Sequence, residues 1–441
     1  MTQKNSTTIN PPGTEEIERP EIAVRLWPKP ILFARLGNAG KIALLCSEGT
    51  EIDPHAVLFS LLTVTGGVIG PNTHLYIGET RHYCRFFSVL VGASSRGRKG
   101  SSAAPILSIF NGLNENFGSI HSSGPLSSGE GLLWRIRDAS GEVDKEGNPT
   151  DPGVEDKRLL IMDGEFAAAL RAMKRETNTL SAILRSAWDD GNISPLTKTK
   201  PVKVTGAHIS FVSHITNAEL SACLTETDSL NGFANRIMWV CTRRQGSVPI
   251  PKKLSEESRQ EILAILGRTL AVAGSGREMS MDEEATTCFE EVYPTLTEER
   301  SGLYGAATSR AEAQTMRLSM ILALIDGSPI IRKQDLLRGL ECWRYCDESA
   351  RFIFGDREPD QRANKILKFL EAGEKTQTDI THELFKKNKA GIAEVLEHLQ
   401  AVGKIESRGE KTGKRPITWW KLSTKYHYDK NGNNDIITTM S

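Results

Sequence analysis

Four short apolar runs alternate with helical patterns along the first half of the chain. The runs span Cys84 to Val91, Leu159 to Met162, His208 to Val212, and the residues that follow Arg236. Each run is nearly continuous in apolar residues and bounded by polar or glycine residues, which is typical of a strand buried on both faces. A helical pattern from Phe166 to Trp188 separates two of them. The alternation predicts a three-layer α/β domain with a mainly parallel sheet.

The patterns outside this region are mostly helical. From Ile31 to Gly70 and from Glu256 to Phe354 the apolar residues recur at helical spacing, and Arg362 to Leu422 shows three helices followed by a hairpin, as in a winged helix. Both ends of the chain are polar. We therefore predict a flexible arm (1–30), a helical prelude (31–70), a core (71–255), a helical lid (256–358), a winged helix (359–425) and a flexible tail (426–441).

Composition indicates a globular, multi-domain protein with no global charge. The 441 residues include 39% apolar and 25% charged residues, and the formal net charge is zero. Any contact with nucleic acid must therefore come from a local patch. Such a patch lies between Lys386 and Lys425, with ten basic residues against four acidic ones. Winged helices also dock proteins, but the charge favours DNA, and the candidate contacts are Lys387, Lys389, Lys411, Lys414 and Arg415.

The cysteines and the hydropathy point to a cytoplasmic protein. Seven cysteines are scattered without a C-x-x-C pair, several of them inside apolar segments, which predicts reduced thiols in the core. The first residues lack the charged-then-apolar pattern of a secretory signal. The most apolar window, Ala56 to Ile69, is interrupted by Gly and Thr and is too short to span a bilayer, so no membrane contact is expected.

A glycine-rich basic segment follows the strand that ends at Val91. The sequence from Val89 to Ser102, V-L-V-G-A-S-S-R-G-R-K-G-S-S, predicts a strand, a tight turn and a helix whose backbone N–H groups would cradle a phosphate. It departs from G-x-x-x-x-G-K-[ST], because Arg98 stands where the lysine belongs. With one extra residue in the loop, Lys99 is the phosphate lysine and Ser101 or Ser102 the Mg²⁺ ligand. Without it, no hydroxyl follows the basic residue, and a plain surface turn remains the alternative. The candidate nucleotide ligands are Gly92, Gly97, Arg98, Lys99, Gly100, Ser101 and Ser102.

An acidic pair follows the second buried strand. Leu159 to Met162 ends at Asp163, Gly164 and Glu165. In a nucleotide-hydrolysing fold one such carboxylate holds Mg²⁺ and the other orients the attacking water. The same residues would also serve as helix caps, since carboxylates are favoured at helix N-termini.

Several motifs occur together in the order found in one family. They are Ser127-Ser128, Gly131-Leu132 and Arg137-Asp138; Glu165-Phe166; N-R-I-M-W-V from Asn235; and Ser309-Arg310 with Arg317-Leu318. In this order they resemble AAA+ helicases of the minichromosome maintenance type, and more closely plasmid- and phage-borne primase/helicase-like ATPases. The resemblance covers Val89 to about Phe354. Gly164 stands where that family has an Asp, which displaces Asp163 by one position.

The resemblance assigns roles to further residues. The predicted hairpin at 193–205, here called the lysine hairpin, would grip DNA inside a hexameric ring through Lys198, Lys200 and Lys203. His214 would be a sensor at a strand end, Arg236 a finger offered to the neighbouring subunit's nucleotide, and Arg310 a nucleotide-sensing residue. Each also has a structural interpretation: an exposed charged hairpin, a hydrogen-bonded core histidine, and two intramolecular salt-bridge arginines.

Together these features predict an ATP- and Mg²⁺-dependent DNA helicase or replication-initiation ATPase of a mobile genetic element. It would act as a ring-shaped homo-oligomer, with single-stranded DNA in the ring and duplex DNA on the winged helix. No primase-like metal cluster is visible, so a separate primase is a candidate partner. Two rivals remain: a DNA-binding regulator that binds ATP with little hydrolysis, and a scaffold that binds no nucleotide.

Overall fold

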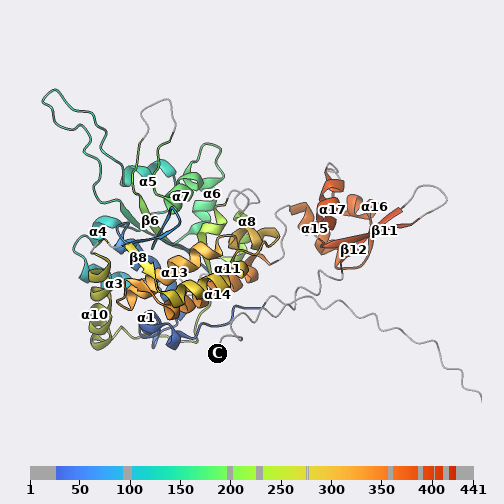
Figure 1. Cartoon of the computed structure of the whole chain (residues 1–441). Helices are drawn as coiled ribbons and strands as arrows, with labels where there is room; N and C mark the ends of the chain where they lie inside the picture. The colour runs from blue at the N-terminus through green and yellow to red at the C-terminus, as the bar shows by residue number, and fades with distance from the viewer. Residues whose placement is uncertain are drawn as a thin grey trace, which may run out of the picture. The chain divides into compact units, whose positions relative to one another are not determined.

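The computed structural model describes residues 26–92, 102–195, 202–224, 232–274, 276, 278–355, 361–385, 391–401, 403–410 and 417–423. The chain divides into two compact units. The larger is Arg25–Pro359, and the smaller contains Asp360–Ser441. Figure 1 shows both, and each is described by itself below.

A parallel five-stranded sheet forms the centre of the larger unit. Its strands lie in the order β4-β5-β6-β3-β7, and every neighbouring pair is parallel. This sheet, with helices on both faces, confirms the α/β class. Because all strands run the same way, their carboxyl ends meet at one edge. The bounds are β3 Phe87–Gly92, β4 His121–Ser122, β5 Arg158–Asp163, β6 His208–Thr216 and β7 Ile237–Thr242.

The strand side chains alternate between two hydrophobic cores. On β3, Leu90 belongs to one core, whereas Val89 and Val91 belong to the other. The same alternation along the other long strands places one helical layer on each face of the sheet. Helices α1 (Gly37–Ser47), α2 (Pro54–Ile69), α3 (Ala104–Leu113), α10 (Glu256–Ala273) and α13 (Ala311–Ile325) contribute to the first core. Helices α5 (Gly129–Arg135), α6 (Phe166–Met173), α7 (Leu180–Asp189) and α8 (Asn217–Cys223) contribute to the second.

The helices after residue 256, for which the sequence predicts a lid, pack into the same unit. Almost every side chain of α13 is buried. Helix α14 (Lys333–Phe354) packs on β7, where Tyr345 Oη donates to the Cys241 carbonyl at 2.7 Å and the Cys241 N–H donates to Ser349 Oγ at 3.1 Å. Two further helices, α11 (Glu283–Leu296) and α12 (Gly302–Thr308), contact α14. Residues 256–355 therefore help to build the core around the sheet.

A second, four-stranded sheet joins distant parts of the chain. Strands β1 (His74–Ile77) and β2 (Thr80–Tyr83) form a hairpin, and β1 also pairs with β8 (Glu278–Met281), which pairs with β9 (Ile330–Ile331). Residue 74 is thus tied to residue 278. The remaining short helical segments of this unit are η1 (Phe33–Arg35), α4 (Phe117–Ile120) and η4 (Ala234–Arg236).

The single helix predicted from Phe166 to Trp188 is two helices, α6 and α7. The break falls at a polar stretch that ends in Asn178. The Asn178 side chain accepts a hydrogen bond from the Leu180 N–H at 2.8 Å and donates to the Ser127 carbonyl at 3.0 Å. An asparagine that bonds the backbone two residues ahead favours a turn over a continuous helix.

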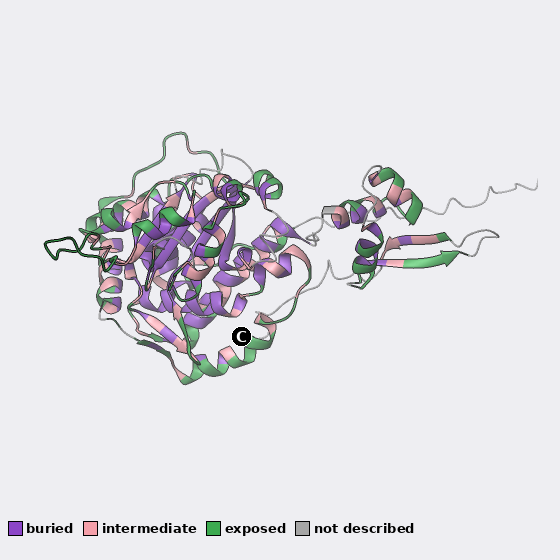
Figure 2. Cartoon of the chain, turned by 90° about the horizontal axis from the view of Figure 1, so that it is seen from above, coloured by how far each residue is buried: buried purple, intermediate pink, exposed green. Residues whose placement is uncertain are grey.

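The smaller unit has the predicted order of three helical segments and a hairpin. These are α15 (Gln361–Leu370), then β10 (Lys375–Thr376), α16 (Gln377–Asp379) and η5 (Ile380–Leu384), then α17 (Ile392–Ala401), β11 (Ile405–Glu410) and β12 (Ile417–Leu422). The strands form an antiparallel sheet in the order β10-β12-β11. Ile366, Leu396 and Trp420 are part of its separate core, and Figure 2 shows the exposed outer residues of its hairpin.

All seven cysteines are free and buried, as the sequence predicts. Burial raises the pKa of the Cys46 and Cys241 thiols to about 12. These thiols therefore stay protonated at neutral pH. Within the described part of the chain, no helix is long and apolar enough to cross a membrane.

Candidate functional site

Asp163 lies at the carboxyl end of β5, at the edge of the sheet where ligands of parallel α/β folds bind. The residue is 3% exposed. Its Oδ1 accepts from the Glu165 N–H at 3.0 Å, and its Oδ2 accepts from Ser213 Oγ on β6 at 3.0 Å. Each carboxylate oxygen has a further lone pair, so the group can still ligate a hard cation such as Mg²⁺ or its water. Ser101, the other predicted Mg²⁺ ligand, lies outside the described residues.

The strand register shows how far this carboxylate lies from Gly92, where the glycine-rich segment begins. Asp163 pairs with Ser213 on β6, and Ser213 pairs with Val89 on β3. Gly92 thus lies two strands across and three residues further along β3, about 10 Å in each direction. Only Gly92 and the buried Ser102 are described among the candidate ligands of this segment. Gly97, Arg98, Lys99, Gly100 and Ser101 lie outside the described residues.

A buried strand and a helix flank that segment. Strand β3 ends at Gly92, and every residue of it is buried. Helix α3 begins at Ala104, with Pro105 in its first turn, where the missing N–H of proline costs nothing. These elements are the predicted strand and helix, and the turn predicted between them lies outside the described residues.

Glu165 lies at the surface beside Asp163. It occupies the N-cap position of α6, and its Oε1 forms an ion pair with Arg171 Nη2 at 2.9 Å. Both side chains are more than half exposed. Exposed pairs of this kind contribute at most about 1 kcal/mol, so the carboxylate can leave Arg171 at little cost.

His214 follows Ser213 on β6 and is half-buried. Its backbone pairs with Leu90 of β3, in register. The residue therefore lies between the strand that carries Asp163 and the strand that leads to the glycine-rich segment. Its predicted sensor role stays a prediction.

Arg236 is paired within its own chain. Its Nη2 lies 2.7 Å from Asp189 Oδ2 at the end of α7, and its Nε lies 3.2 Å from Asp189 Oδ1. Nη1 donates to the Gly232 carbonyl at 2.5 Å. The arginine is almost fully buried, whereas the Asp189 side chain is 42% exposed. The carboxylate thus lies between the Arg236 guanidinium and solvent.

Three more arginines surround Trp188 and Asp189. Arg310 lies 3.7 Å from Asp189 Oδ1. The buried Arg317 lies over the Trp188 ring, with its guanidinium carbon 3.4 Å from the ring centroid. Arg317 and Arg85 donate to the Trp188 carbonyl at 3.0 and 3.1 Å. The Trp188 carbonyl lies at the C-terminal end of α7, and the negative end of a helix dipole favours cations.

Burial and mutual repulsion act on this arginine cluster. Burial lowers the pKa of Arg85 to about 10, and that of Arg317 falls well below its usual value through burial and the charge of Arg85. The pKa of Arg310 is lowered by burial and by the charge of Arg236. Sequence reasoning missed Arg85, Trp188 and Asp189. The only available signal was W-D-D at the predicted end of a helix.

The lysine hairpin starts and ends at the opposite edge of the sheet, ahead of β6. Ile193 and Val204 exchange both backbone hydrogen bonds, at 2.8 and 2.9 Å, so the described residues form an antiparallel hairpin base. Lys203 lies in this base and is exposed. Lys198 and Lys200 lie outside the described residues, as do the candidates of the smaller unit, Lys387, Lys389, Lys411, Lys414 and Arg415.

Comparison with known proteins adds no assignment. No family model matches the chain, and no curated protein matches its sequence significantly.

Proposed function

We propose that the larger unit is an ATP-hydrolysing motor that acts on DNA, as a helicase or replication-initiation ATPase of a mobile genetic element. One observation carries this proposal. Asp163 ends a strand at the carboxyl edge of a parallel sheet, two strands from β3, which leads into a glycine-rich basic segment. A carboxylate and a glycine-rich segment at this edge suit a Mg²⁺–nucleotide.

The residues would divide the work as follows. Backbone N–H groups of the glycine-rich segment and Lys99 bind the phosphates, with Ser101 and Asp163 as Mg²⁺ ligands. Bound Mg²⁺ would neutralise charge on the phosphates. Glu165 orients the attacking water after its carboxylate has separated from Arg171. His214, on β6, forms a hydrogen bond with the phosphate.

Arg236 would act on the nucleotide of a neighbouring subunit in a ring. It must first leave Asp189, and Arg310 can then keep that carboxylate paired, since Arg310 already lies 3.7 Å from it. An arginine that reaches a phosphate only in the transition state raises the rate without tightening ATP binding.

A second function, an ATP-binding regulator with little hydrolysis, is favoured by a different observation. Arg236 is held by three hydrogen bonds to Asp189 in its own chain. Gly164 also stands between the two carboxylates where the resembling family has an acid. If these bonds persist with ATP bound, hydrolysis stays slow.

DNA contact by the smaller unit would come from its hairpin rather than from α17. The exposed face of α17 carries Glu394 and Glu397, which repel phosphates. The β11–β12 hairpin carries Arg408 with its guanidinium carbon 5.2 Å from the Trp419 ring centroid, and further basic residues lie between the two strands in sequence. This supports a winged helix that binds duplex DNA mainly through its wing.

ATP binding and turnover, each measured with and without single-stranded DNA, test the function. The motor predicts turnover stimulated by DNA, the regulator predicts binding without turnover, and absence of binding refutes both. Lys99→Ala should abolish binding. Arg98→Ala, the matched control in the same segment, should weaken it less, and the reverse ranking would reject the one-residue insertion.

A further inference from the structure

Trp134, on the last turn of α5, is a large aromatic side chain exposed at the surface. It is 55% exposed, although α5 buries Leu132 and Leu133 next to it. The Arg137 guanidinium carbon lies 3.8 Å from the centroid of its ring, and Arg137 Nη1 donates to the Trp134 carbonyl at 2.9 Å. One part of the indole is thus covered by a cation, and more than half of the residue remains open.

Arg137 is itself held in place. Its Nε and Nη2 donate to the two carboxylate oxygens of Asp151 at 2.7 and 2.8 Å. A bidentate pair of this kind fixes the plane of the guanidinium. The indole and its cation are therefore arranged before any ligand arrives, which lowers the entropy cost of binding.

The base of the lysine hairpin is hydrogen-bonded to Asp138, the residue that follows Arg137. The backbone N–H of Asp138 donates to the Lys203 carbonyl at 2.8 Å, and Asp138 Oδ2 accepts from Thr205 Oγ1 at 2.7 Å. Lys157 neutralises Asp138, with 2.8 Å between Nζ and Oδ1. The base of the lysine hairpin and the end of α5 thus form one surface.

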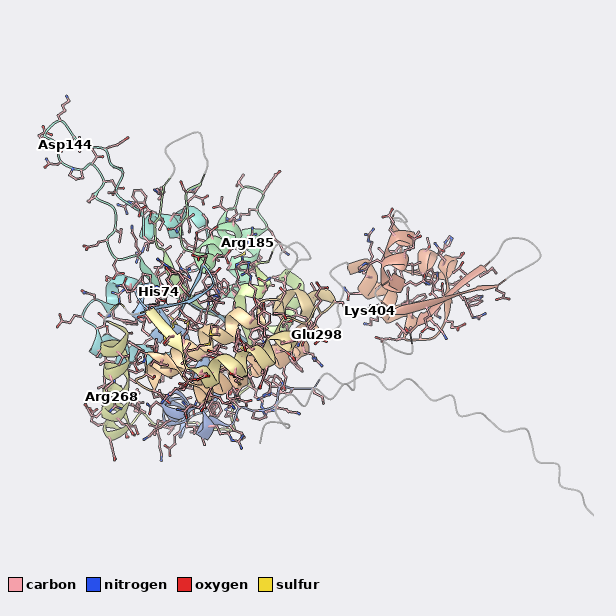
Figure 3. The ribbon with its side chains drawn as sticks, in the orientation of Figure 1. His74, Asp144, Arg185, Arg268, Glu298 and Lys404 are labelled. Atoms are coloured by element: carbon pink, nitrogen blue, oxygen red, sulfur yellow. The ribbon has the colours of Figure 1, made fainter. Side chains whose placement is uncertain are left out.

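The charges on this surface are suited to an anionic chain. Asp138 and Asp151 are each paired with a basic residue. The exposed Glu130, one helical turn before Trp134, accepts a hydrogen bond from Thr179 Oγ1 at 2.7 Å. Arg135 and Lys203 are exposed, and within the described residues neither forms an ion pair. Residues 138–157 extend away from the body as an arm, and Asp144 lies in its outer part (Figure 3). Glu142 and Glu146 are two residues from Asp144 in sequence and are exposed. That acidic part disfavours phosphates, so the cationic region is confined to the base of the arm.

We propose that Trp134 stacks on a base of single-stranded nucleic acid, while Arg135 and Lys203 contact its phosphates. An aromatic ring for a base and cations for the backbone are what sequence-independent binding of single strands requires. A protein partner fits less well, because charged groups and not apolar ones surround the indole. The inference rests on the proposed function in that it names single-stranded nucleic acid as the substrate. It places that contact at the edge of the sheet opposite Asp163.

The test uses the full chain and two labelled oligomers without ATP: oligothymidylate and an abasic oligomer of equal length. Trp134→Leu keeps an apolar side chain but removes the stacking surface, and should weaken oligothymidylate binding about five- to a hundredfold. Trp134→Phe should retain most of the affinity. Val143→Ser is the control, because Val143 is an exposed apolar residue of the arm. This change should leave oligothymidylate affinity unaltered. On the abasic oligomer, Trp134→Leu should match the unsubstituted protein.

Two results would overturn the inference: unchanged oligothymidylate affinity in Trp134→Leu, or an equal loss on both oligomers. The second would show that the indole supports the surface or binds something other than a base. ATP turnover of the unsubstituted protein separates this failure from that of the proposed function. Absent ATP binding with an intact Trp134 effect rejects the motor alone, whereas DNA-stimulated turnover with no Trp134 effect rejects the stacking site alone.

Discussion

The carboxyl ends and the amino ends of the strands form two edges of the five-stranded sheet, and these two edges are built differently. At the carboxyl edge, Asp163 is buried and both its oxygens are hydrogen-bonded. At the amino edge, the arm precedes β5 and the lysine hairpin precedes β6, and Figure 1 shows chain segments that extend from the body beside α5. Trp134 and Lys203 are exposed there. A small charged ligand needs buried, fixed groups, whereas a long polymer needs an extended surface.

The strands connect these two edges rigidly. Strand β6 begins at His208, just after the lysine hairpin, and carries Ser213 and His214 near its other end. A shift of β6 on nucleotide binding would therefore reach the hairpin directly. In the proposed function, one sheet thus separates the nucleotide site from the site of the polymer and still couples them.

The largest expected effect concerns Arg236 and the proposed hydrolysis of ATP. Arg236→Ala should bind ATP nearly normally but hydrolyse it about 10³-fold more slowly, because the arginine acts on charge that appears only in the transition state. Steady-state turnover and nucleotide binding measure the two quantities. Arg310→Ala, next to the same Asp189, is the matched control with a smaller expected loss.

Mixed subunits sharpen this result. Combining Arg236→Ala with Lys99→Ala should restore some turnover, because one type of interface then pairs an intact loop with an intact arginine. If Arg236 serves only as the partner of Asp189, its loss will instead lower the melting temperature. Co-assembled subunits without recovered turnover would argue against action between subunits.

The next prediction concerns the binding site of duplex DNA, which the proposed function places on the smaller unit and not on either edge of the sheet. Removing residues 360–441 should leave basal ATPase activity in place and weaken duplex binding. If the wing neutralises about three phosphates, the intact chain should lose about 40-fold more affinity than the truncated one between about 50 and 200 mM salt. Equal salt dependence of the two proteins would assign the smaller unit to protein docking.

The next prediction concerns the pH dependence of stability that arises from His208, the first residue of β6. Burial and the charge of Arg85 lower the pKa of His208 to about 3, and its Nε2 lies 2.9 Å from the Gly66 carbonyl oxygen. The folded ring stays neutral, whereas the unfolded ring binds a proton below about pH 6.5. Stability is therefore complete above pH 6.5 and is lost as the pH falls toward 3. At pH 5 the loss from this residue is about 2 kcal/mol.

Urea unfolding at pH 7.5 and pH 5 measures this loss. His208→Gln keeps a donor for the Gly66 carbonyl and has no proton to bind. It should therefore lose about 2 kcal/mol less stability on acidification than the unsubstituted protein. His82, whose pKa burial lowers to about 4, remains in both proteins and provides the common background. Equal acid loss in both would show that His208 is not the responsible group.

The smallest effect concerns the junction of arm and hairpin. Asp138→Asn keeps the backbone bond to Lys203 but removes the ion pair with Lys157. We expect a stability loss of about 1 kcal/mol or less and a several-fold weaker binding of single strands, because the surface loses rigidity. Thermal melting and oligothymidylate titration measure both. Tighter binding would show instead that the Asp138 charge opposes the nucleic acid.

Features that depend on near neighbours in the chain could be predicted from the sequence. Short apolar runs located β3, β5, β6 and β7, because a strand buried on both faces needs such a run. It also placed Asp163 at a strand end and the helix–hairpin order in the smaller unit. The break between α6 and α7 was encoded locally too, by Asn178, but the helical period on either side concealed it.

The pairings between residues distant in sequence could not be predicted, because they depend on how the whole chain packs. Period and composition carry no information on which segments meet, so they could not show that β1 pairs with β8, or that α13 shares a core with α2. They could not show that Arg236 and Arg310 both reach Asp189, or that Arg137 covers Trp134. Charged side chains are long and adaptable, and their partners are set by where packing brings the backbone, which is why these contacts appear only in the folded chain.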